Sequence, residues 1–156
     1  MSEDTISRID QFSIDNIFTP NSYVYEIESL NKNYRNQGSG PYINLAVEVF
    51  TDVPFSTKPG VAGRREEGVA VYEIFDTKGS GKRSIAQISD KILAKFIVPA
   101  NPSKQRKLFP TGSEKGTITF YQISQRPAVD VSRSGSRHDW RRLDVLVSYT
   151  KYYDVT

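Results

Sequence analysis

The chain has 156 residues, of which 37% are hydrophobic and 12% aromatic, so it fits one globular domain with a core and is not a coiled coil, a collagen or a fully disordered chain. It has no cysteine and a single histidine, which excludes disulfides, thiolate nucleophiles and cysteine zinc sites and leaves little for a histidine metal site. No stretch approaches the roughly 18 consecutive apolar residues of a membrane helix, and the polar start lacks the layout of a signal peptide. We therefore expect a soluble protein that is made in a cytoplasm, with no membrane partner and no cofactor.

The net charge of +3 is unevenly distributed along the chain. Residues 1–60 hold 4 basic and 8 acidic side chains, whereas residues 61–156 hold 17 basic and 10 acidic ones. A positive later part could face nucleic acid or an acidic partner surface, and a solvated surface with interleaved charges is the alternative.

The first part of the chain predicts a helix, two strands and two connecting segments. Residues 1–22 suggest a short, irregular helix, and 22–30 (SYVYEIESL) alternate as a strand, followed by a polar loop at 31–41. The run YINLAVEVF (42–50) is rich in β-branched and aromatic residues and predicts a strand. Residues 51–68 contain prolines, glycines and charges and read as a long loop or arm, which at this length is typical of a functional or mobile segment.

The second part predicts the main helix and three more strands. GVAVYEIF (68–75) is apolar on both faces and predicts a central strand, and residues 84–97 show apolar side chains at helical spacing. GTITFYQIS (116–124) and residues 140–155 alternate as strands. The order favours a single α+β domain over 1–156, with one main amphipathic helix packed on a mostly antiparallel sheet and a long loop or arm.

The glycine-containing stretch DTKGSGKRS (76–84) superficially resembles a phosphate-binding loop. Asp76 stands where the motif needs its first glycine, and Arg83 stands where it needs a hydroxyl for Mg²⁺, so two of the defining positions fail. Ser84 and Gln87 instead form an S-x-x-Q pattern, which predicts a capping box at the start of the helix. Lys78, Lys82 and Arg83 are not explained by capping, and three cations beside a helix N-terminus suggest contact with something negative outside the domain.

No other constellation points to catalysis. Serines, His138 and Asp139 lie in one polar loop, but closeness in sequence is not a triad, and Glu66 with Glu67 reads as a pair of solvated carboxylates. Trp140 is expected in the core or at an interface. Tyrosines near basic residues in the last strand keep a nucleic-acid-binding module open as an alternative; these are Tyr149, Tyr152, Tyr153, Arg141, Arg142 and Lys151.

The order of these features resembles the tail terminator proteins of long-tailed bacteriophages. The resemblance covers residues 42–153 and lies in four successive features: YINLAVEVF, the long arm, the run GRREEGVAVYEIFDTKGSGKRSIAQISDKILAKF, and GTITFYQIS followed by DWRRLDVLVSY. The individual motifs are short, and their order and spacing carry the resemblance.

The resemblance implies a non-enzymatic assembly protein of the virion. Such a protein forms a homohexameric ring on the last ring of the tail tube, stops tube growth and presents a surface to head-completion or neck proteins, while DNA passes through the channel without sequence-specific binding. Another tail-tube or neck connector protein is the close alternative. A closed ring needs a heterologous interface, and we expect the 51–68 arm and a strand edge to supply its two patches. The candidate interface residues are Pro54, Phe55, Pro59, Arg64, Arg65, Lys78, Lys82, Arg83 and Trp140.

Overall fold

The computed structural model describes residues 2–28, 40–55, 59–60, 62–77, 81–97, 105–131 and 140–154, without the side chains of residues 2, 3, 81 and 82. Two α-helices lie within these ranges, α1 (Ser2–Ser13) and α2 (Gly81–Phe96), and a five-residue π-helical turn, η1 (Ile14–Phe18), continues α1. The apolar side chains of α2 recur at three- and four-residue steps and are buried on one face of the helix. They are Ile85, Ile88, Ile92 and Phe96.

The described strands form a single sheet dominated by three long members. They are β1 (Val24–Ile27), β2 (Tyr42–Pro54), β3 (Gly63–Thr77), β4 (Lys107–Leu108), β5 (Thr117–Gln125), β6 (Val129–Val131) and β7 (Trp140–Asp154). The strand order is β1-β2-β3-β7-β5-β4, and β6 pairs with the first residues of β7. β1 and β2 are parallel, and every other pair is antiparallel.

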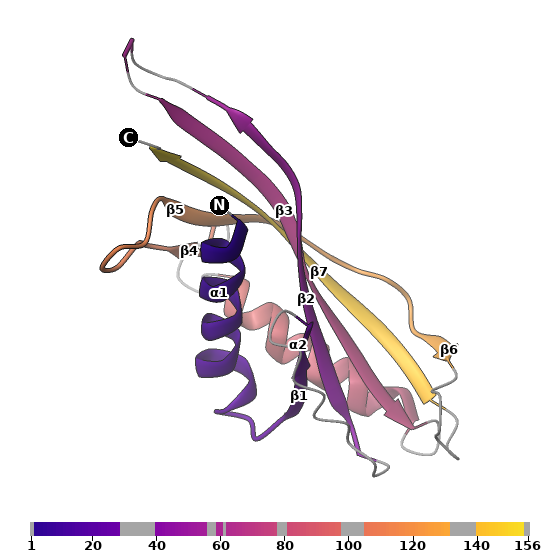
Figure 1. The fold of residues 1–156 in the computed structure, drawn as a ribbon. Coiled ribbons are helices and arrows are strands. Elements are labelled where there is room, and N and C mark those ends of the chain that lie inside the picture. The colour runs from indigo at the N-terminus through magenta and orange to yellow at the C-terminus, as the bar shows by residue number, and fades with distance from the viewer. Residues whose placement is uncertain are drawn as a thin grey trace.

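Both helices lie on the same face of the curled sheet, as Figure 1 shows. The core between them is mainly aliphatic and aromatic, and Phe96 of α2 is at its centre. Its ring lies 5.6 Å from the ring of Phe12, 4.9 Å from that of Phe120 and 5.9 Å from that of Tyr72, measured between centroids. These distances are typical of tilted and edge-to-face aromatic pairs, so one helical side chain joins α1, β3 and β5 in a single core.

The predicted α+β class is confirmed, with a mostly antiparallel sheet and an amphipathic helix packed on it. The strand predicted at 68–75 is central, since β3 lies between β2 and β7. The irregular helix expected at 1–22 is present as α1 and η1, and its irregularity is the π-helical turn.

Two local predictions are wrong. Much of the segment 51–68 is strand rather than loop: β2 continues to Pro54 and β3 begins at Gly63. The capping box fails because α2 begins at Gly81, which places Ser84 inside the first turn instead of before it. Residues 31–39 and 78–80, which were expected to form a loop and the glycine turn, lie outside the described residues.

Candidate interaction site: the arm and the charges at its base

The strands β2, β3 and β7 continue past the helices as an extension, which Figure 1 shows projecting from the body of the molecule and whose base β5 joins by pairing with residues 150–152. We call this extension the arm and define it as residues 51–55, 63–67 and 150–154. Its ladder is continuous: Pro54 pairs with Arg64, and Arg64 pairs with Tyr153. The backbone N–H of Phe55 also donates to the carbonyl of Gly63 at 2.8 Å, which closes the ladder toward the hairpin end. The segment expected to be a long loop or arm is therefore largely a hydrogen-bonded sheet.

The helix-facing side of the long strands changes chemistry where the arm begins. In the body, this side of β7 carries Val145 and Val147, which are fully buried. Two residues beyond Tyr149 the same alternation brings Lys151 to this side, and its partner on β3 is Glu66. Side chains that pack a hydrocarbon core in the body are thus replaced by charged ones at the base of the arm.

Lys151 and Glu66 form an ion pair that is almost completely removed from solvent. Their side chains are 1% and 0% exposed, and Lys151 Nζ lies 3.8 Å from Glu66 Oε2. The hydroxyl of Tyr149 donates to Glu66 Oε1 at 3.2 Å, and Lys151 Nζ also donates to Asp4 Oδ2 of α1 at 3.3 Å. The ammonium further lies 4.7 Å from the centre of the Tyr153 ring. A buried charge is tolerated when it is paired and hydrogen-bonded. Each charge here has one hydrogen-bond partner, Asp4 for the ammonium and Tyr149 for the carboxylate, while Glu66 Oε2 has no hydrogen bond among the described residues and faces only the ammonium.

Burial is the largest cause that raises the pKa of Tyr149, and the neighbouring Glu66 carboxylate raises it further. The phenol is therefore a neutral hydrogen-bond donor in the folded protein. Gly68 makes room for this hydroxyl: a Cβ at that position would lie 2.6 Å from the Tyr149 hydroxyl and would clash with the carbonyl oxygen of Glu48. The absence of a side chain on β3 thus lets Tyr149 reach Glu66.

Arg8 of α1 ties the helix to the turn between β4 and β5. Its Nη1 donates to the carbonyl oxygens of Lys115 and Gly116 at 3.1 and 2.8 Å, and its Nη2 donates to that of Leu108 at 2.9 Å. The first turns of α1 are thus attached to the β4–β5 turn by Arg8 and to the base of the arm by the contact from Asp4 to Lys151.

A second ion pair links β2 and β3 within the arm. Arg64 Nε donates to Asp52 Oδ1 at 2.7 Å and its Nη2 donates to the Asp52 carbonyl at 2.7 Å, while the Tyr153 hydroxyl donates to Asp52 Oδ2 at 3.2 Å. Burial acts to raise the pKa of Asp52, but the hydrogen bond and charge of Arg64 and the hydrogen bond from Tyr153 together lower it. Asp52 is consequently held as a carboxylate.

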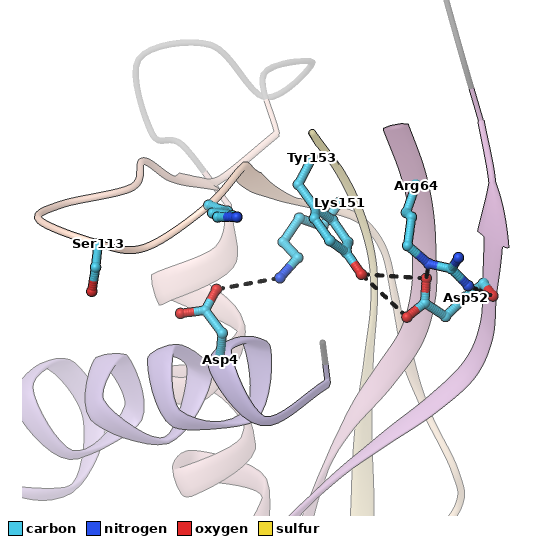
Figure 2. Close-up of a pocket in the computed structure, with 7 residues that line it drawn as sticks. Asp4, Asp52, Arg64, Ser113, Lys151 and Tyr153 are labelled. Atoms are coloured by element: carbon cyan, nitrogen blue, oxygen red, sulfur yellow. Dashed lines mark hydrogen bonds and ion pairs between the residues drawn. The ribbon is translucent and has the colours of Figure 1, made fainter. Parts of the chain in front are cut away.

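The Asp4–Lys151 and Asp52–Arg64 ion pairs line a pocket of about 690 Å³ between α1, the β4–β5 turn and the arm (Figure 2). Its lining residues are Asp4, Asp52, Arg64, Ser113, Lys115, Lys151 and Tyr153. Three of these side chains are basic and two are acidic, and both acids are paired with bases of the same pocket. These acidic and basic side chains neutralise one another's charge. The lining residues include no nucleophile activated by a base.

The opposite side of the arm, which faces away from the helices, is open to solvent and partly aromatic. One row across it runs from Val53 through Arg65 and Tyr152 to Thr117. The rings of Phe55 and Tyr152 lie 5.1 Å apart on this side, and both are exposed. An exposed apolar cluster framed by polar side chains is typical of a contact surface.

The structure brings four of the predicted interface residues together on the arm. Pro54, Phe55, Arg64 and Arg65 follow one another around the paired ends of β2 and β3, and Pro59 is exposed in the turn beyond them. Arg64 is paired with Asp52 and Arg65 with Glu67, so of these residues Phe55 is the exposed apolar side chain that no ion pair engages.

The other predicted interface residues lie elsewhere. Lys78 and the side chain of Lys82 are outside the described residues, and Arg83 is exposed in the first turn of α2. Trp140 is only 1% exposed and packs edge-on against Tyr42, with ring centres 5.6 Å apart. Its indole is therefore buried and offers no exposed surface in this structure.

The tyrosine set that kept nucleic-acid binding open does not form one exposed surface. Tyr149 is buried in the core, and Arg142 is paired with Glu73 and Asp144 at 3.5 and 3.1 Å. Base stacking needs exposed rings beside free cations, and of the three tyrosines of this set only Tyr152 is exposed.

The buried charges of the arm were missed by the sequence reasoning. Glu66 was expected to be a solvated carboxylate, and neither Asp4 nor Arg8 was singled out. The signal that could have found the site is Lys151, because it continues the alternation of buried Val145 and Val147 and therefore belongs to the core side of its strand.

Within the described residues, no group of three or more acidic, histidine or cysteine side chains is placed to hold a metal ion. His138 lies outside those residues. Among the described helices, none has the length and apolar character to span a bilayer.

Comparison with known proteins defines a fold and no family. No family model matches the sequence, and the search of curated proteins finds no relative. A solved structure whose title is only an identifier aligns with this chain at a TM-score of 0.64 and 13% sequence identity, over 97% of this chain and 95% of the other. At that identity the likeness concerns the fold alone, so the chain is similar to a solved α+β protein over nearly its whole length.

Proposed function

We propose that this chain is a non-enzymatic assembly protein that forms a ring on the end of a phage tail tube, stops its polymerisation and provides the head–tail joining surface. The observation that carries the proposal is the arm, which extends beyond the helices and exposes Phe55 and Tyr152 on its open side. The projecting part of the arm adds nothing to the core of its own copy, but it can contact a neighbouring copy.

The buried ion pairs support the same proposal. A projecting sheet held only by its ladder would bend easily, but the contacts among Lys151, Glu66 and Asp4 fix the base of the arm to α1. A rigid arm reaches its contact without losing much conformational entropy on assembly. The resemblance to tail terminator proteins in residues 42–153 supplies the specific role, in which the tail tube protein and a head-completion or neck protein are the partners and DNA passes through the ring.

The proposal is tested by negative-stain microscopy of the purified protein, alone and mixed with tail tubes. We expect ring-shaped particles with a central channel and, in the mixture, tubes with a ring at one end. Tubes that are neither capped nor bound would show that the terminator role is wrong.

A matched pair of variants tests the arm. Phe55→Ser with Tyr152→Ser removes the exposed ring pair, and Ile97→Ser removes an exposed apolar side chain elsewhere on the molecule. We expect the first variant to lose rings and caps while the second keeps both. Equal capping by the two variants would exclude the open side of the arm as a contact.

A further inference from the structure

Two edges of the sheet are without a strand partner in the part of the chain that the structure describes. β1 covers β2 only at residues 42–45, so from Ala46 onward β2 pairs with β3 alone. β4 covers β5 only at Ile118 and Thr119, and one further bond joins the N–H of Phe120 to Arg106. Residues 121–125 of β5 therefore pair with β7 alone. An open edge presents unpaired N–H and C=O groups and is a template for another strand.

The two open edges lie at the same level of the sheet. Following the residue pairs across the strands, one row runs from Val47 through Ala70 and Val147 to Ile123. The next row runs from Glu48 through Val69 and Ser148 to Gln122. Each row thus begins on the open edge of β2 and ends on the open edge of β5.

The strand directions allow these edges to pair between copies. Successive strands alternate across β2, β3, β7 and β5, so β5 runs antiparallel to β2. A rotation about an axis roughly parallel to the strands keeps each strand's direction, so the β5 of a second copy placed beside β2 is antiparallel to it. Each copy contributes four successive strands, β2, β3, β7 and β5. Because four is even, neighbouring strands stay antiparallel across the junction from one copy to the next.

The two edges also share a side-chain pattern. Val47 and Ile123 are partly buried on the helix-facing side, where each packs against the core from its own edge. Each edge also contains a bulge, between Val49 and Thr51 on β2 and between Phe120 and Gln122 on β5. The residue inside each bulge is an exposed aromatic, Phe50 at 66% and Tyr121 at 47%.

We propose that the open edge of β2 in one copy pairs with the open edge of β5 in the next copy, so that the sheets join head to tail into a closed antiparallel ring. This inference adds a second contact between copies beside that of the arm, and it rests on the proposed function only for the number of copies and the role of the ring. Pairing puts Val47 against Ile123 of the next copy and brings the two bulge aromatics to the same junction. It also removes both exposed edges, which in an open monomer would invite uncontrolled aggregation.

The absence of cysteine allows the contact to be tested by crosslinking. Glu48 and Gln122 are exposed and stand at the two ends of one row, so Glu48→Cys with Gln122→Cys places a thiol on each edge of every copy. Cβ atoms directly opposite in an antiparallel pair lie about 4.5–5.5 Å apart, close to the separation that a disulfide spans. Glu48→Cys with Ser124→Cys tests the register shifted by two residues on the same side of the sheet.

On mild oxidation we expect one of these double variants to give a ladder of covalent multimers on a denaturing gel, ending at the size of the ring. The matched control is Glu48→Cys with Lys91→Cys, since Lys91 is exposed on α2 and away from both edges. It should give no ladder. Circular dichroism confirms that each variant is folded.

Other results would overturn the pairing. Efficient covalent dimers from Glu48→Cys alone would show that two β2 edges meet, and a monomer by light scattering at the crosslinking concentration would show that no such contact forms. A ring by light scattering without a ladder in either double variant would place the interface elsewhere and leave the ring proposal standing. A ladder with uncapped tail tubes would support the pairing and remove the terminator role.

Discussion

The same three strands form both the body and the arm, yet the two regions are held together by different interactions. In the body, the helix-facing side of β3 and β7 carries residues such as Ile74 and Val145, which are fully buried under α1 and α2. At the base of the arm, the corresponding positions carry Glu66 and Lys151, equally buried but charged. One sheet therefore passes from a hydrocarbon core to an ion-pair core within a few residues.

The comparison shows why the arm projects. An apolar face beyond the helices would need another layer to cover it, whereas a face of paired charges can end at a pocket open to water. Hydrophobic burial is non-directional, but an ion pair at low dielectric is stable only with its particular partners in place. The body should thus tolerate conservative substitutions, while the arm should depend strongly on single side chains.

The largest expected effect comes from removing the cation of the buried pair. Lys151→Met leaves Glu66 buried without its ammonium partner, and breaking a buried pair in this way typically costs about 3–5 kcal/mol of folding free energy. Ile74→Val in the body should cost only about 0.5–1.5 kcal/mol. Chemical denaturation of both variants measures the difference, and equal losses would remove the distinction between the two regions.

Two further variants make that result specific. Lys115→Met changes an exposed lysine of the same pocket and should alter stability by less than about 0.5 kcal/mol. Lys151→Met with Glu66→Gln replaces both charges and should recover much of the loss, because the uncompensated buried carboxylate is gone while the Tyr149 hydroxyl keeps an acceptor. No recovery would mean that Lys151 acts through packing of its aliphatic stem instead.

An intermediate effect is expected at the boundary between the two regions. Gly68→Ala places a Cβ against the Glu48 carbonyl and the Tyr149 hydroxyl, so the strands or the tyrosine must shift. Overpacking of this kind typically costs about 1–3 kcal/mol. Denaturation midpoints measure the loss. The double variant Gly68→Ala with Tyr149→Phe relieves only the contact with the Tyr149 hydroxyl. Full recovery of stability in that double variant would show that the contact with the Glu48 carbonyl does not destabilise the fold.

The body was predictable from the sequence because its strands and main helix repeat apolar side chains at simple periods. YINLAVEVF and the isoleucines of α2 indicate their buried faces without any tertiary information. The arm was less predictable, since prolines, glycines and charges over 51–68 have the composition of a loop. What makes that segment a sheet is its pairing with β7, almost ninety residues later along the chain, together with the charges that α1 contributes.

The candidate site illustrates the same limit. Phe55 and Arg65 could be chosen from the sequence as residues of an arm, and both are accessible there. The pairing of Glu66 with Lys151 could not, because two charged residues 85 positions apart have no local pattern that brings them together. Trp140 shows another limit: a large aromatic at the start of a strand suits an interface or a core, and its burial beside Tyr42 is visible only in the structure.

The smallest expected effect is a loosening of the arm at acidic pH. The pKa of Asp52 lies below its ordinary value of 3.8 in the folded protein, so the carboxylate stabilises the fold above that value and the contribution is lost as pH falls through the lower, folded pKa. Asp52→Asn removes this titration and weakens the bonds from Arg64 and Tyr153. The stability difference between the natural chain and Asp52→Asn should therefore be constant from pH 7 to 5 and shrink as pH falls below about 4.

Urea denaturation midpoints at each pH measure that difference, and Asp15→Asn on the exposed side of η1 is the control. The effect should be small because the Asp52–Arg64 pair is partly exposed and screened by water, unlike the pair between Glu66 and Lys151. A difference that stays constant down to pH 3 would mean that the Asp52 carboxylate is not what links β2 to β3.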